Sequence, residues 1–336
     1  MITDRPDHPD QRGALESSDA TDTPTKVRRL IDEGAATLPV PGGGDTRRRW
    51  RELTRLSRQD VVVGRLLEAH ADADAILAEL TGDRVAPGQW WAVWAAEPPT
   101  PRLDAVRSPS GWDLVGAKAW CSGAGLCSHA LVTARAQDEI HLFAVELDHR
   151  GVTTDLSTWH AAGMARSATG TVSFDGVPAR LVGSRDDYIE RAGFWHGAIG
   201  VAACWLGGAE AVADTLRGTA RARRLDAHAL AHLGAVDATL AGARWAVDGA
   251  ADETDGAPRD AAAGRVRALR VRAVVESAAT VVIDRVGRAL GAAPLSLDAS
   301  HATAVADLGV YVRQSHAERD LAALGSALGA TGDETA

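Results

Sequence analysis

The sequence has little cysteine, methionine, phenylalanine or tyrosine, and the cysteine shortage in particular narrows what the chain can be. Its 336 residues include 3 cysteines, 2 methionines, 3 phenylalanines and 2 tyrosines, beside 10 tryptophans. An odd number of cysteines without metal-ligand spacing argues against a disulfide framework and predicts free thiols in a reducing, cytoplasmic compartment. We therefore expect a fold held together by an apolar core, for which the 46% of hydrophobic residues is sufficient.

The chain also lacks the features of membrane and nucleic-acid proteins. No apolar run approaches the roughly 20 residues of a membrane-spanning helix, and the polar start MITDRPDHPDQRG has no apolar segment typical of a secretion signal. The 36 Lys and Arg residues are outnumbered by 45 Asp and Glu, which gives a formal net charge of -9. Because nucleic-acid binders carry a basic excess, we expect no nucleic-acid partner and no membrane partner.

Several common catalytic and binding motifs are absent. The sequence contains no GxGxxG after a strand, no GxxxxGK[ST] and no GxSxG. A Rossmann site, a P-loop and a serine-hydrolase elbow are therefore unsupported. His228 and His232 lie four residues apart in HALAH, but no acidic residue separates them and no third ligand is evident. We interpret them as a surface or interface pair and predict no metal site.

Composition divides the chain into four parts. Residues 1–25 are polar and proline-rich and are predicted to form a disordered tail. Residues 26–89 have helical periodicity, residues 90–185 carry short strands between turn residues, and residues 186–330 are alanine-rich and helical. The predicted fold class is α+β multidomain, with N-terminal helices, a central small β-barrel or sandwich and a C-terminal four-helix bundle.

Within the first helical part, a short helix is predicted to end at Pro39, and a later one covers about 60–81. Between them, Asp45 or Thr46 is predicted to cap a helix that begins with the basic run 47–51. That run is interpreted as a solvated face, with phosphate binding as the alternative. The bundle helices are predicted over the four segments 188–224, 228–250, 259–290 and 301–326, with loops at 251–258 and 291–298 and Asp298 as the last cap.

Three segments occur in a fixed order in the strand-rich part. They are WAAEP at 94–98, LVGAKAWCS at 114–122 and GMARS at 163–167 followed by VSFDGVP at 172–178. Together they resemble the TEP, LxGxKxWIT and GxRxS…FxxVxVP segments of the acyl-CoA dehydrogenase family. The resemblance covers roughly residues 27–326. It implies the family's helical–β–helical fold and its flavin cofactor, FAD.

The resemblance also places the flavin. Ala95 and Ala96 would lie under the isoalloxazine ring, and Trp120 and Ser122 would contact its face and its N5 edge. A hydride-accepting flavin needs an apolar wall on one face and a hydrogen-bond donor near N5, and these residue types supply both. The family's QxxGGxG segment, which reaches the flavin of a second subunit, resembles RALGAAP at 288–294. Gly291 is retained and Arg288 replaces the glutamine, so the resemblance implies a homodimer or homotetramer.

The catalytic base departs from the usual pattern. Family chemistry removes the α-proton of an acyl thioester with a carboxylate while the β-hydride passes to the flavin. The position of the usual glutamate is Ser315 here, followed by His316. Some members carry the glutamate at the start of the bundle, where this chain has Glu190 followed by Arg191. Glu190 is therefore the predicted base.

The resemblance thus predicts α,β-dehydrogenation of an acyl thioester, with electrons leaving to an electron-transfer protein. Two departures make long acyl chains unsuited: the residues after Pro98 lack the family's Gly-Ser-Asp, and the N-terminal helical part is short. A reduced-flavin monooxygenase on the same fold, with His316 as proton donor, is one alternative. A relative that keeps the fold without catalysis is the other.

Overall fold

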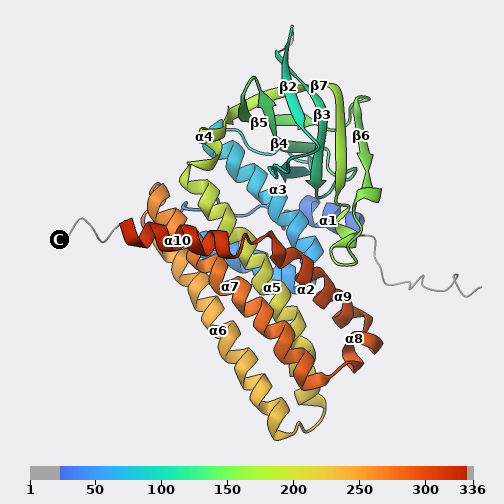
Figure 1. Cartoon of the computed structure of the whole chain (residues 1–336), viewed down its shortest axis with the longest axis vertical. Coiled ribbons are helices and arrows are strands. Elements are labelled where there is room, and N and C mark those ends of the chain that lie inside the picture. Colours follow the sequence, from blue (N-terminus) through green and yellow to red (C-terminus); the bar gives the residue numbers. More distant parts are fainter. Residues whose placement is uncertain (1–22, 110, 331–336) are drawn as a thin grey trace, which may run out of the picture.

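The structure is a computed structural model that describes residues 23–109 and 111–330. Figure 1 shows a β-domain at one end, long helices extending to the other end, and the helices α3 and α5 running between them. The predicted helical–β–helical order is confirmed. Most of the predicted disordered tail, residues 1–22, lies outside the described residues. Residues 23–25 begin a helix, so the predicted tail is too long at that end.

Three helices precede the strands: α1 (Thr23–Asp32), α2 (Thr46–Gln59) and α3 (Val61–Leu80). The helix predicted over 60–81 is α3, and Asp60 caps it by accepting hydrogen bonds from the amides of Val62 and Val63. The first predicted helix was too long, because α1 ends at Asp32 and the chain turns before Pro39. The apolar stripe of α3 is buried along most of its length.

The N-terminus of α2 is capped from far along the chain. Asp45 makes no side-chain cap, whereas Asp255 accepts hydrogen bonds from the Thr46 amide at 3.0 Å and the Thr46 hydroxyl at 2.6 Å. The local capping prediction was therefore wrong. The basic run was also misinterpreted as simply solvated: Arg47 pairs with Asp252, Arg51 pairs with Asp248 at 2.7 Å, and a third arginine, Arg49, is buried.

The strands are β1 (Trp91–Trp94), β2 (Leu103–Ser108), β3 (Gly111–Cys121), β4 (His129–Ala136), β5 (Glu139–Glu146), β6 (Val152–Asp155) and β7 (Gly170–Ser184). Five of them pair in a closed circuit, β2–β3–β7–β5–β4 and back to β2. β1 lies parallel to β4, and β6 pairs with β7. The predicted small β-barrel is therefore confirmed, and closure removes the exposed edges that an open sheet would present.

The C-terminal part contains α4 (Arg185–Ile189), α5 (Ala192–Ala222), α6 (Ala227–Gly256), α7 (Ala261–Leu290), α8 (Ala293–Leu297), α9 (Ala299–Tyr311) and α10 (Glu318–Ala330). The predicted loop at 251–258 is largely the end of α6. The helix predicted over 301–326 is interrupted between α9 and α10, where the 3₁₀ turn η3 (Val312–Gln314) precedes Ala317 in a left-handed conformation. Asp298 caps α9 as predicted, by accepting from the His301 amide.

Helix α5 forms the centre of the molecule and packs against α2, α3, α6, α7 and α9. Among the described residues it is the one helix long and apolar enough to cross a membrane, yet 78% of its most apolar window is buried in the protein. It is therefore a core helix. Gly207 permits its close contact with α2, because a Cβ there would lie 2.3 Å from the carbonyl oxygen of Thr54.

Candidate functional site

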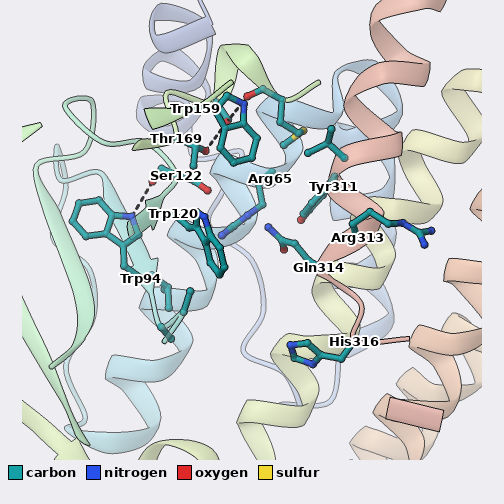
Figure 2. Close-up of a pocket in the computed structure, with 16 residues that line it drawn as sticks. Arg65, Trp94, Trp120, Ser122, Trp159, Thr169, Tyr311, Arg313, Gln314 and His316 are labelled. Atoms are coloured by element: carbon teal, nitrogen blue, oxygen red, sulfur yellow. Dashed lines mark hydrogen bonds between the residues drawn. The ribbon is translucent and has the colours of Figure 1, made fainter. Parts of the chain in front are cut away.

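A cavity of about 590 Å³ lies where the β-domain meets α3 and the end of α9. Its volume is in the range of small-molecule and cofactor sites. Figure 2 shows Trp120 and Ser122 on one side, Tyr311 and Gln314 on the other, and Arg65 between them. The lining residues come from five separate stretches of the chain: Arg65; Val93, Trp94, Ala95 and Ala96; Trp120 and Ser122; Trp159, Met164, Ser167 and Thr169; and Val310, Tyr311, Arg313, Gln314 and His316.

Trp120 is held against the cavity by an irregular backbone. It has φ 59°, a left-handed conformation that costs a bulky residue about 1–3 kcal/mol. The pairing of β3 with β7 shifts register between Lys118 and Cys121, so this residue leaves the ladder. Trp120 is 61% exposed, whereas Lys118 before it and Cys121 after it are buried. The bulge therefore turns a large indole out of the barrel and into the cavity wall.

Ser122 and the residues after β1 complete this wall. The Trp94 indole donates a hydrogen bond to the carbonyl oxygen of Ser122 at 2.9 Å, which fixes the segment after β3 against β1. Ala95 and Ala96 follow β1 directly and are half-buried on the same wall. The four residues predicted to surround the flavin ring, Ala95, Ala96, Trp120 and Ser122, are thus brought together on one cavity.

A buried cation joins the first two sequence motifs. The Lys118 ammonium is 3% exposed and donates to the Glu97 carboxylate at 2.5 Å and to the Thr133 carbonyl oxygen at 2.8 Å. Burial lowers the pKa of Lys118, while the carboxylate of Glu97 acts in the opposite direction. Because Glu97 follows Ala96 and Lys118 precedes Trp120, this interaction sets the spacing of the two segments that line the cavity.

The third motif docks the β-domain onto α9. Gly163 lies so close to α9 that a Cβ there would be 2.1 Å from the carbonyl oxygen of Ala306. Arg166 pairs with Asp60 at 2.7 Å and with Asp307 at 3.1 Å, which joins the N-terminus of α3 to α9. Asp307 also accepts from the Met164 amide. These contacts place Met164 and the 3₁₀ turn η2 (Ala165–Ser167) on the cavity.

The sequence did not predict the cavity wall formed by α3 and the end of α9, apart from His316. Arg65, Tyr311 and Gln314 line the cavity there, and Arg272 holds this end in place by donating to the carbonyl oxygen of Gln314 at 3.2 Å. The one available signal was a charged pair, Arg65 and Glu68, inside the otherwise apolar start of α3. His316 also lines the cavity, with its Nδ1 3.3 Å from Asp320.

The other predicted residues lie away from this cavity. Glu190 is exposed at the end of α4 and is not among the lining residues. Arg288 is exposed and pairs with Asp284 on α7, and Gly291 ends that helix with φ 69°. Ser315 does not line the cavity either; its hydroxyl accepts from the Ala317 amide. The base and second-subunit roles given to these residues stay predictions.

Among the described residues, no group of three His, Cys, Asp or Glu side chains is placed to hold a metal ion. His228 is exposed, and His232 contacts Arg285 at 3.5 Å. The cavity instead has the chemistry of a flavin site: an outward-facing indole, small residues beside it, and hydroxyl groups at Ser122 and Thr169. Among the described residues, its buried Tyr311 hydroxyl has only the weakly bonding Cys204 thiol as a neighbour, which leaves it able to bind a polar ligand. The residues present therefore fit the isoalloxazine ring.

Residues 96–177 match the family model for the acyl-CoA dehydrogenase middle domain. No curated protein matches the chain in sequence. Several solved structures resemble nearly all of it. The dibenzothiophene monooxygenase TdsC from Paenibacillus sp. A11-2, in complex with FMN and indole, has 17% identity and a TM-score of 0.72, and the match covers 90% of this chain and 94% of that one.

The nitrososynthase from Micromonospora carbonacea var. africana has 20% identity and a TM-score of 0.75, over 91% of this chain and 88% of that one. XiaF from Streptomyces sp., in complex with FADH2 and glycerol, has 20% identity and a TM-score of 0.70, over 90% and 87%. At this identity the likenesses show the fold. The chain therefore has an acyl-CoA dehydrogenase-like fold, and residues 96–177 resemble the middle domain of that family.

Proposed function

We propose that this chain is a flavin-dependent monooxygenase that oxidises a small molecule bound in the cavity beside Trp120. One observation carries the choice of reaction: among the residues that the structure describes, none that lines the cavity is Asp or Glu. Removal of an α-proton from an acyl thioester needs a carboxylate in contact with the substrate. The cavity offers hydroxyl groups, an imidazole and guanidinium groups instead.

In this proposal Trp120, Ala95 and Ala96 form the wall under the ring, and Ser122 supplies the hydrogen-bond donor beside it. Reduced flavin, when bound, supplies two electrons to O₂, so that one oxygen atom enters the substrate and the other leaves as water. His316, which lines the cavity, donates the proton needed there as a general acid. Its exposed position and its contact with Asp320 let it be reprotonated from solvent.

The alternative remains α,β-dehydrogenation of an acyl thioester with Glu190 as the base. The match of the middle domain to the acyl-CoA dehydrogenase model supports it. It requires Glu190, now exposed at the end of α4, to reach the substrate. It also requires an electron-transfer protein to reoxidise the flavin, whereas the monooxygenase requires a supply of reduced flavin.

The flavin form and the assembly belong to the same proposal. The cavity fits the ring that FMN and FAD share. FAD is the form implied by the resemblance, and FMN and FADH2 are bound by the structural relatives. Arg288 and Gly291 are proposed to contact the flavin of a second subunit, as in the family, where a guanidinium suits a pyrophosphate. That role requires a homodimer or homotetramer. We also propose that the protein acts in the cytoplasm.

Anaerobic titration separates the two reactions. Flavin-loaded protein mixed with butyryl-CoA, isovaleryl-CoA and octanoyl-CoA is expected to keep its visible flavin absorbance. The same protein given reduced flavin, ¹⁸O₂ and indole as a probe is expected to place one ¹⁸O atom in the product, and His316→Ala is expected to lower that yield by about 10²-fold or more.

Bleaching of the flavin by an acyl-CoA without oxygen contradicts the monooxygenase proposal. If that bleaching is lost in Glu190→Gln but retained in Glu139→Gln, an exposed carboxylate on β5, the dehydrogenase alternative is established with its predicted base. Bleaching that survives Glu190→Gln assigns the dehydrogenation to another base.

A further inference from the structure

A charged pair on α3 stands directly behind the cavity. Arg65 lines it, and the guanidinium donates to the Glu68 carboxylate at 2.8 Å. Glu68 is 3% exposed. Burying an ion pair costs desolvation energy that a single hydrogen bond repays only in part. Stability alone therefore does not account for these two charged residues in the apolar stripe of a core helix.

The pair leaves hydrogen-bond donors unused at the cavity. Among the described residues, the Nε atom of Arg65 is buried without a hydrogen-bond partner, and the hydroxyl of Tyr311, a residue 1% exposed, has only the weakly bonding Cys204 thiol as a neighbour. Both residues line the cavity, and Figure 2 shows both side chains directed toward its centre. Each buried donor that is left unsatisfied destabilises the protein. A ligand that brings an acceptor oxygen between them removes this cost.

The charged residues around the cavity favour a negatively charged ligand. The other two basic side chains of its lining are already engaged near the surface: Arg313 pairs with Glu276 at 2.6 Å, and His316 contacts Asp320. Arg65 has only the buried Glu68 as its paired carboxylate. No described residue in the lining is acidic, so the cavity offers an anion the Arg65 guanidinium without a carboxylate in the wall itself.

We infer that Arg65 and Tyr311 form an anion subsite that binds a carboxylate or another oxyanion group of the substrate. The inference rests on the proposed function for the identity of the substrate cavity and adds the class of substrate to it. Arg65 binds the charge, and the Tyr311 hydroxyl donates a second hydrogen bond. The subsite orients the substrate from the part of the cavity formed by α3 and the end of α9.

The protonation state of Glu68 controls how strongly Arg65 attracts the ligand. Burial raises the pKa of Glu68 to about 7, against the opposing effect of the Arg65 and Arg49 guanidinium groups. When Glu68 is protonated, Arg65 is no longer neutralised from behind. The pair thus lets the chain bury a cation at the cavity and still present it to an incoming anion.

The same donors suit one other acceptor, the ring carbonyl oxygens of the flavin itself. The two sources are separated by measuring flavin and anion binding independently. An anion subsite predicts that Arg65 governs the binding of a small anion in the absence of flavin. A flavin contact predicts that Arg65 governs flavin affinity and leaves the anion unaffected.

The test uses benzoate and its neutral analogue benzamide as probes, with the tryptophan fluorescence of the full chain as the readout and no flavin present. Benzoate is expected to bind at least about tenfold more tightly than benzamide. Arg65→Gln is expected to remove the preference, while Glu68→Gln retains or enlarges it. Arg313→Gln, which changes an exposed lining arginine already paired with Glu276, is the matched control and is expected to keep the preference.

Arg65→Gln leaves Glu68 without its partner, so the double variant Arg65→Gln with Glu68→Gln provides a neutral pair that folds without a buried unpaired charge. Loss of the preference in both Arg65 variants, with unchanged flavin affinity, supports the subsite. Equal binding of benzoate and benzamide to the unaltered chain overturns it, as does a preference that survives in the double variant. Failure to bind flavin contradicts the proposed function instead, because the benzoate measurement needs no flavin.

Discussion

At the scale of single residues, the cavity joins side chains from two local motifs of the β-domain to side chains from α3 and the end of α9. Ala95, Ala96, Trp120 and Ser122 belong to two motifs whose order and spacing survive in the sequence. Arg65 and Tyr311 are 246 positions apart by their numbering, and no pattern in the sequence relates them. Their proximity depends on how α9 packs against α3, which only the fold determines.

Glu68 gives a residue-scale prediction for stability. Burial raises the pKa of Glu68 from 4.5 to about 7. Between these two pH values, the carboxyl of the folded state keeps a proton that the unfolded state has lost. The stabilisation is complete below about pH 4.5 and is lost as the pH rises toward about 7. We expect the free energy of unfolding of the unaltered chain, measured with urea, to fall relative to that of Glu68→Gln between about pH 5 and pH 8.

The comparison with Glu68→Gln isolates this carboxyl from the other groups that face it. They come from each element packed around it: Arg49 on α2, Arg65 and Asp72 on α3, Tyr188 on α4, Cys204 on α5, Arg272 on α7 and Tyr311 on α9. Parallel pH profiles for the two proteins would show that Glu68 titrates in its ordinary range when folded.

At the scale of elements, periodicity and turn residues predicted most helices and strands, and failures occurred where a distant partner decides the outcome. The cap of α2 comes from Asp255, 209 positions beyond Thr46, so a search for a local cap chose the wrong residue. The final helix breaks between α9 and α10 although its composition favours continuation. The break places Gln314 and His316 on the cavity, so here the tertiary structure overrides helix propensity.

The contact between Gly163 and α9 gives the element-scale prediction. Gly163→Ala places a methyl group 2.1 Å from the Ala306 carbonyl oxygen and 2.7 Å from Val310, which forces the β-domain away from α9. We expect a loss of about 1–3 kcal/mol in the free energy of unfolding. Flavin affinity is expected to fall with it, since Met164 and Ser167 line the cavity.

Gly309→Ala on α9 is the matched control. Nothing lies within 4 Å of its added methyl group, and alanine favours a helix more than glycine does, so it is expected to stabilise the protein by about 0.5–1 kcal/mol. Thermal unfolding of the two variants measures both effects. Equal stabilities would mean that Gly163 does not set the distance between the barrel and α9.

At the scale of the whole molecule, the cavity exists because three parts of the chain meet. The barrel contributes Trp120 and Ser122, the N-terminal helices contribute Arg65, and the C-terminal helices contribute Tyr311 and Gln314. The sequence predicted the three parts and their order. It also placed the base at Glu190, but the structure leaves that residue exposed at the end of α4, outside the cavity.

Equilibrium dialysis with FMN and with FAD tests the central claim, that a flavin ring lies in this cavity against the indole of Trp120. We expect one flavin bound per chain and at least about tenfold weaker binding in Trp120→Gly, where glycine keeps the left-handed backbone and removes only the aromatic face. Trp245→Ala, which removes an indole 74% exposed on α6, should bind flavin as the unaltered chain does. Absence of flavin binding, or equal affinity in Trp120→Gly, would contradict the account.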